Sequence, residues 1–227
     1  MKNAKQEMIE SYSNRIVGSR VFEAIAFIFT LHRRIYFHFK LRKLVGTIKN
    51  SKRILKAELV KAKNRRDNER LELIRIGLYL CIMQKDLSLL HSRLVMALNP
   101  EVKEVYAKQI ALILFEFIQD QPKLFGRSYR DIIYKLPDHE KKIDLLKILG
   151  METSLIKKER GGLLKEIRIN LAAHRDCNGE KQLQVIEKLD FVEMHRLSMQ
   201  LYSILGRYLN LLTQVVLELH EKKQDSY

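Results

Sequence analysis

ERLELIRIGLYLCIMQKDLSLLHSRLVMALNP, residues 69–100, is the stretch of sequence that decides the fold. Its apolar residues recur at steps of three and four positions, at Leu73, Ile76, Leu80, Met83, Leu87, Leu90, Leu94 and Ala97. This spacing places them on one face of an α-helix, as in the seam of a helical bundle. Asn99-Pro100 ends the pattern, because a residue that precedes proline disfavours the helical conformation. The sequence therefore predicts a helix over residues 69–98.

Residues 101–150 continue the helical pattern in shorter pieces. We expect a second helix over 101–120 that ends before Pro122. After a loop, we expect a short helix over 128–136. Another short helix should begin at Pro137 and end at Gly150, because proline and glycine often mark helix ends.

Two longer helices are predicted in the last third of the chain. The first covers 152–176, or begins at 163 if Gly161-Gly162 breaks it. The second covers 190–221 and opens with the capping-box-like spacing of Asp190 and Glu193. Its predicted seam consists of Leu197, Leu201, Ile204, Tyr208, Leu211 and Val215. Tyr208 alone among them has a polar tip, so its hydroxyl needs a partner or an exit to water.

The fold class follows from these helices. No segment alternates apolar and polar residues as a half-buried strand does. The chain has only 9 glycines and 3 prolines, and 46% of its residues are hydrophobic, enough for a sizeable core. We predict an all-α protein, a bundle of four or more helices.

Charge is distributed unevenly along the chain. Residues 1–70 hold 18 of the 42 Lys and Arg residues but only 6 of the 27 Asp and Glu residues, so they carry +12 of the net +15. This imbalance favours a polyanionic partner, either nucleic acid or an anionic membrane surface. A solvated basic helix that serves only to keep the protein in solution is the alternative.

The first 68 residues are interpreted as a basic helical extension of the bundle, which would occupy residues 69–227. We expect a helical arm, with a hairpin that breaks near Gly46, and a boundary within KNRRDNER at 63–70. Whether the arm is a separate folding unit stays open. Its candidate nucleic-acid-binding residues are Arg33, Arg34, Lys40, Arg42, Lys43, Lys52, Arg53, Arg65 and Arg66.

The sequence favours a cytoplasmic location. The N-terminal residues lack the apolar core of a signal peptide. The most apolar run, residues 21–31, is far shorter than the roughly twenty residues of a membrane-spanning helix. Cys81 and Cys177 lack metal-ligand spacing and suit a reducing compartment. We expect a soluble protein without a membrane partner; peripheral attachment through residues 21–60 is an alternative.

A histidine interrupts the apolar face of one predicted helix, in KEIRINLAAHRD at 165–176. At about 100° per residue, Leu163, Leu164, Ile167 and Leu171 form one face, and His174 falls inside it. Arg168 and Asn170 lie at the two edges of that face, and Arg175 lies almost directly above Arg168. Asn170 and His174 are four residues apart and can touch. Arg168 and His174, about 120° apart, cannot easily converge within one helix.

A second copy of the helix could bring such a pair together. In a two-fold interface the arginine of one chain can approach the histidine of the other. The imidazole would then serve as general acid or base near neutral pH. The guanidinium would hold a phosphate and neutralise charge in the transition state. This chemistry needs no metal and no cofactor.

The string RINLAAHRD resembles the signature of the HEPN superfamily, Arg-x(4–6)-His, in its bacterial "AHRD" version. That resemblance implies a helical bundle that dimerises and a metal-independent endoribonuclease that activates a ribose 2′-hydroxyl. It also implies a role in bacterial defence or toxin–antitoxin systems, with RNA as substrate and an antitoxin or larger defence complex as possible partner. Arg168 and His174 would be catalytic, with Asn170, Arg175 and Asp176 in support. Ile169 departs from the family, which often has a polar residue there.

Two other interpretations of the motif stay open. The chain could be a non-catalytic HEPN-like adaptor that binds nucleic acid or a larger defence complex. It could also be an unrelated helical protein in which His174 is a buried interface residue and Arg175-Asp176 a solvated helix end. A nuclease requires His174 beside an accessible, electropositive cleft. An adaptor predicts a sealed His174 and binding that survives its mutation.

Overall fold

The computed structural model describes residues 42–173 and 179–224. Every regular element within these ranges is a helix, which confirms the all-α prediction. The chain divides into two compact units, Met1–Leu44 and Val45–Tyr227. In the first unit only residues 42–44 are described, and they are helical.

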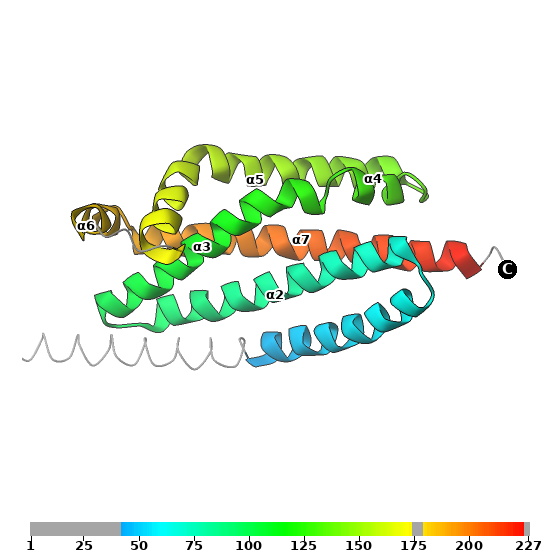
Figure 1. Ribbon diagram of the computed structural model, residues 1–227, viewed down its shortest axis with the longest axis horizontal. Helices are drawn as coiled ribbons and strands as arrows, with labels where there is room; N and C mark the ends of the chain where they lie inside the picture. The colour runs from blue at the N-terminus through cyan, green and yellow to red at the C-terminus, as the bar shows by residue number, and fades with distance from the viewer. Residues whose placement is uncertain (1–41, 174–178, 225–227) are drawn as a thin grey trace, which may run out of the picture. The chain divides into compact units, whose positions relative to one another are not determined.

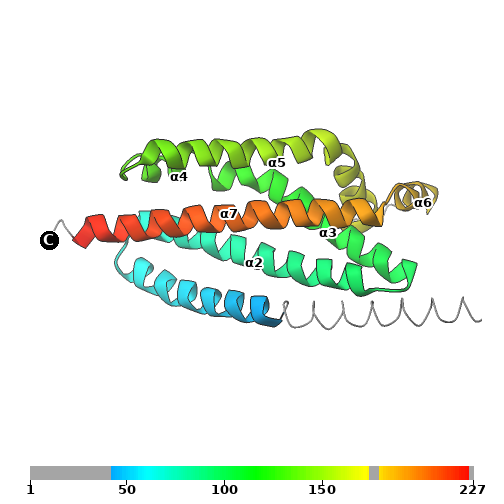
Figure 2. The ribbon, with the colours of Figure 1, turned by 180° about the vertical axis from the view of Figure 1, so that it is seen from behind.

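The second unit is built around four long helices. These are α2 (Asn68–Met96), α3 (Pro100–Leu124), α5 (His139–Ile167) and α7 (Phe191–Gln224). Three shorter elements connect them: α4 (Arg127–Ile133), the π-helix η1 (Arg168–Ala173) and α6 (Gly179–Glu187). Helix α7 packs against α2, α3 and α5, and α3 packs against α2 and α5 (Figure 1). Figure 2 shows α7 crossing in front of α2 and α3 from the opposite side.

The predicted seams form the core. On α7 all six seam residues are buried. On α2 the seam is buried from Leu73 to Leu94, except that Leu90 is half-buried. Tyr208 is fully buried, and its hydroxyl accepts a hydrogen bond from Gln121 Nε2 at 2.9 Å. The predicted need of Tyr208 for a polar partner is therefore confirmed.

Polar side chains cap the starts of α3 and α7. Asn99 Oδ1 accepts a hydrogen bond from the Glu101 amide at 2.7 Å, and Pro100 is the first residue of α3. Asp190 Oδ1 accepts from the Val192 amide at 2.8 Å at the start of α7. These bonds satisfy amides that have no partner within the helix, so the helix starts are fixed locally.

Two predicted helix ends are wrong. Helix α3 runs through Pro122 to Leu124, and α5 runs without a break through Gly150, Gly161 and Gly162. Pro122 removes one helical hydrogen bond, and the helix ends two residues later, at Leu124. In α5, buried residues continue on both sides of Gly150, and packing against α3 and α7 outweighs a glycine cost of about 1 kcal/mol.

The basic segment before α2 is one continuous helix over residues 42–64, so the hairpin predicted near Gly46 is wrong. The chain turns instead at 65–67, and Arg66 adopts a left-handed conformation with φ of 54°. Glu58 then pairs with Arg70 of α2, and Ile48 and Ala62 are buried. Residues 45–68 thus belong to the same compact unit as the bundle.

Replacing Gly206 with alanine should stabilise the protein. Gly206 lies inside α7, and a Cβ built there meets no atom within 4 Å. The alanine lowers the entropy of the unfolded chain, so we expect the free energy of unfolding to rise by about 0.5–1 kcal/mol. Urea titration measures this change. At Gly77 a Cβ would lie 3.1 Å from Leu212 Cδ2, so Gly77→Ala should show no such gain.

Within residues 42–173 and 179–224, none of the helices combines the length and the apolar character needed to cross a membrane.

Candidate active site

The motif KEIRINLAAHRD lies where α5 ends and the chain turns towards α6. From Arg168 to Ala173 the helix widens into the π-helix η1, which contacts α3, α5 and α6 (Figure 1). A π-helical turn is less stable than an α-helical one, and such turns are frequent at functional sites. The sequence motif and the irregular turn therefore coincide.

Arg168 opens this turn and is exposed to solvent. Its guanidinium carbon lies 5.2 Å from the centre of the Phe115 ring of α3. A cation this close to an aromatic face is attracted by the electron density of the ring. Phe115 thus positions the guanidinium while leaving it open to a ligand.

The neighbours of Arg168 anchor the turn in the core. Leu164 and Ile167 are fully buried, as the helical wheel predicts. Ile169 is 45% exposed. Asn170 donates a hydrogen bond from Nδ2 to the Glu166 carbonyl oxygen at 3.0 Å. One amide hydrogen of Asn170 is thus bonded within the turn itself.

Ion pairs secure both flanks of the motif. Arg160 of α5 pairs with Glu193 of α7, with Nε 2.5 Å from Oε1. Glu166 pairs with Lys188, which follows α6, at 3.1 Å. The first pair joins residues on opposite sides of the motif in sequence, and the second joins the motif itself to the residue after α6. They tie the end of α5 to the chain beyond α6.

The remaining motif residues, His174, Arg175 and Asp176, lie outside the described residues. The contact of Asn170 with His174 and the approach of Arg168 to a histidine of a second chain therefore stay predictions. The 100° wheel on which they rest assumes an α-helix, whereas 168–173 is π-helical. Of the five predicted site residues, the structure places Arg168 and Asn170, two positions apart on η1.

The predicted nucleic-acid-binding residues of the arm fall into two groups. Arg33, Arg34 and Lys40 lie outside the described residues. Those on the helix and the turn after it are solvent-exposed except for one: Arg42, Lys43, Arg53, Arg65 and Arg66 are exposed, and Lys52 is half-buried. Exposure leaves these side chains accessible to a polyanion, and their binding of RNA stays a prediction.

A pair of histidines that no sequence pattern predicted joins α2 to the start of α7. The rings of His91 and His195 stack with centroids 4.6 Å apart. His91 Nδ1 lies 2.6 Å from Ser198 Oγ, and that hydroxyl donates to the His195 carbonyl oxygen at 2.7 Å. His91 and His195 are 104 positions apart in the sequence, so no local spacing could reveal the cluster.

Acidification should weaken the fold through His91. Burial, together with neighbouring His195, lowers the pKa of His91 to about 4. In the unfolded chain a histidine has a pKa near 6.5. Between that pH and about 4, the unfolded state therefore binds a proton at His91 and the folded state does not. The free energy of unfolding should fall from about pH 7 to pH 4 by about 1–2 kcal/mol, allowing for solvent at the ring. Urea titrations at both pH values should show a smaller fall of the unfolding free energy for His91→Gln than for the wild type. An equal fall in both proteins would show that His91 does not cause the pH dependence.

A metal centre needs several ligating side chains in one place. Within the part of the chain that the structure describes, no three His, Cys, Asp or Glu residues gather closely enough to hold a metal ion. No known protein family, no curated protein and no solved structure matches this chain.

Proposed function

We propose that the protein is a metal-independent endoribonuclease of the HEPN type. The observation that carries the proposal is Arg168, the arginine of the HEPN-like motif. It is solvent-exposed at the first residue of a π-helical turn, and Phe115 holds its guanidinium in place. Among residues 42–173 and 179–224, no carboxylate pairs with Arg168 within 4 Å, whereas a purely structural arginine is expected to have such a partner. The exposed guanidinium is suited to a phosphate.

The proposed reaction uses the two motif residues and the substrate alone. His174 takes the proton of a ribose 2′-hydroxyl, and the 2′-oxygen attacks the adjacent phosphorus. Arg168 binds the phosphate and stabilises the charge that develops on it. The bond to the 5′-oxygen breaks, and the imidazolium of His174 returns its proton to that oxygen. The products are a 2′,3′-cyclic phosphate and a free 5′-hydroxyl.

The active form is proposed to be a homodimer. A two-fold interface brings the same turn from two chains together, so Arg168 of one chain can serve the histidine of the other. By the family resemblance, the cellular role is bacterial defence or a toxin–antitoxin system. An antitoxin or a larger defence complex would then be the protein partner.

Replacing Arg168 with alanine tests the proposal at the residue that the structure places. We expect cleavage of labelled single-stranded RNA to slow by about 10²–10³-fold, because one donor to the transition-state charge is lost. Arg75→Ala removes an exposed arginine of α2 and serves as the control for net charge. Equal cleavage by both variants would contradict the role of Arg168.

A non-catalytic adaptor is the second candidate. The observation in its favour is the basic segment, with +12 of the net charge in residues 1–70 and exposed arginines on its described helix. Such a surface binds nucleic acid without chemistry. The adaptor predicts RNA binding that Arg168→Ala leaves unchanged, and no cleavage by the wild-type protein.

A further inference from the structure

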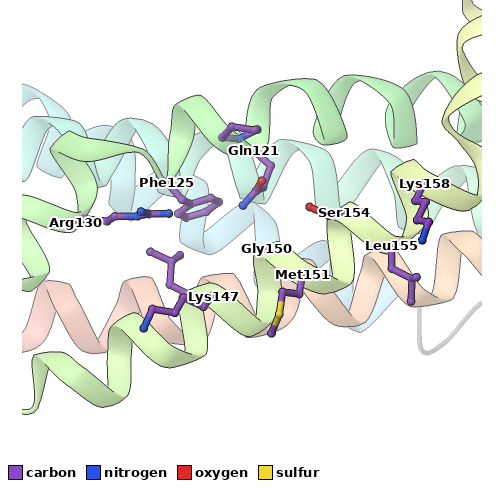
Figure 3. A pocket seen from close by; sticks show the side chains of 11 residues that line it. Gln121, Phe125, Arg130, Lys147, Gly150, Met151, Ser154, Leu155 and Lys158 are labelled. Atoms are coloured by element: carbon purple, nitrogen blue, oxygen red, sulfur yellow. The ribbon is translucent and has the colours of Figure 1, made fainter.

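A groove of about 640 Å³ lies between the end of α3, α4 and the middle of α5 (Figure 3). Its α5 wall extends from Leu146 to Lys158, and Gln121 and Phe125 line the opposite side. The volume falls within the range of ordinary ligand sites. The groove is open along its length, so an extended chain can enter it from the surface.

Gly150 keeps the middle of the groove open. It lies inside α5, and a Cβ built there would meet Gln121 Nε2 at 3.6 Å, an ordinary contact. Gln121 is itself fixed, because its Nε2 donates to the buried Tyr208 hydroxyl at 2.9 Å. The amide oxygen of Gln121 and the exposed hydroxyl of Ser154 can bond to a ligand.

Three cations surround the groove. Figure 3 shows Arg130 and Lys147 towards one end and Lys158 towards the other. Among the described residues, no carboxylate pairs with Arg130 or Lys158 within 4 Å. Lys147 pairs with Asp144 at 2.9 Å, but both side chains are about two-thirds exposed, so the pair is weak and exchangeable.

The positive charge continues along α5 towards the motif. Lys147, Lys158 and Lys165 lie within about 20° of one line on the helix surface, at steps of about 16 and 10 Å. Lys165 is exposed and precedes Arg168 by three residues. Between Lys158 and Lys165, a Cβ built at Gly162 meets nothing within 4 Å, so a ligand can approach the helix backbone there.

The groove also offers apolar surface. Met151 is 64% and Leu155 55% exposed, and both line the groove. Cations beside exposed apolar side chains suit a ligand that carries both negative charges and apolar faces. A single nucleic-acid strand has both, since apolar side chains can hold its bases and cations its phosphates.

We propose that the groove between α3 and α5 binds a segment of single-stranded RNA, whose backbone then follows α5 to Arg168. This inference rests on the proposed function for the identity of the ligand. It assigns Arg130, Lys147 and Lys158 to phosphates and the surface around Gly150 to a base. These residues bind and position the strand and take no part in the reaction.

The test measures binding of a fluorescein-labelled single strand with 2′-O-methyl riboses, which cannot be cleaved by attack of a 2′-hydroxyl. Fluorescence anisotropy gives the affinity at several salt concentrations. The variant Arg130→Gln/Lys147→Gln/Lys158→Gln should bind at least about tenfold more weakly, and its salt slope should fall by about 2. A control with the same charge change carries Arg75→Gln, Arg93→Gln and Lys141→Gln, none of which lines the groove.

A second pair of variants tests the groove without changing charge. Gly150→Leu fills the groove and should weaken binding at least about fivefold with an unchanged salt slope. Gly150→Ala adds only a methyl group that fits and should bind like the wild type. The proposal is overturned if the groove triple variant and the control triple variant bind the strand equally well. It is also overturned if Gly150→Leu and Gly150→Ala bind it equally well. The groove would then be tested for an acidic protein segment.

The two proposals can fail separately. Groove-dependent binding of the modified strand, without cleavage of unmodified RNA, would support the groove and overturn the nuclease. If unmodified RNA is cleaved but the groove variants bind the modified strand as tightly as the wild type, only the proposed role of the groove is overturned.

Discussion

Replacing His174 with alanine is expected to slow RNA cleavage by about 10²–10⁴-fold, the usual contribution of a positioned general base. The variant keeps Arg168 and the groove, so it should bind RNA like the wild type. The loss should therefore appear in kcat rather than in KM. Single-turnover cleavage of labelled RNA, with the affinity measured in parallel, separates the two quantities.

A histidine outside the motif provides the matched control for this result. His220 is exposed on α7, and His220→Ala should cleave RNA at the wild-type rate. Circular dichroism and size-exclusion chromatography must first show that both variants fold and assemble alike. Wild-type cleavage by a folded His174→Ala protein would exclude this histidine as the base.

Replacing Glu218 with alanine is expected to lower the free energy of unfolding by about 3 kcal/mol, the cost of breaking a buried ion pair from one side. Lys142 Nζ lies 2.9 Å from Glu218 Oε2, and the Lys142 side chain is only 8% exposed. The ammonium also donates to the Pro137 carbonyl oxygen at 2.8 Å. Without Glu218, the Lys142 ammonium would have only the neutral Pro137 carbonyl oxygen as a partner, in a site largely closed to water.

Two further variants make this stability prediction specific. The pair Lys147–Asp144 lies in solvent, which screens the attraction between the two charges, so Asp144→Ala should have little effect. The double change Lys142→Met/Glu218→Leu removes both charges and should restore most of the lost stability. Urea titration measures all three proteins. A loss below 1 kcal/mol for Glu218→Ala would show that Lys142 reaches water.

The spacing of apolar residues predicted most of this fold. Leu80 and Leu201, for example, were assigned to seams by their positions alone, and both are buried. The boundary between α2 and α3 was also predictable, because a residue that precedes proline disfavours the helical conformation. These features depend on neighbours within one helix, and the local sequence contains them.

Features that depend on contacts between helices were not predictable. Gly150 is a plausible helix end by its own propensity, yet tertiary packing carries α5 through it. The same error ended a short predicted helix at Gly150, inside the continuous helix that forms one wall of the groove. In the candidate site, the motif was found from the sequence. The π-helical turn at Arg168 and the ring of Phe115 beneath it were not, because both require α3 beside α5.

The chemical nature of the RNA ends tests the central claim most directly. Wild-type protein is incubated with labelled single-stranded RNA in EDTA, and the products are identified by mass spectrometry. Attack by the 2′-hydroxyl without a metal predicts fragments that end in a 2′,3′-cyclic phosphate and begin with a 5′-hydroxyl. Fragments that end in a 3′-hydroxyl, or cleavage that requires an added divalent cation, would contradict it.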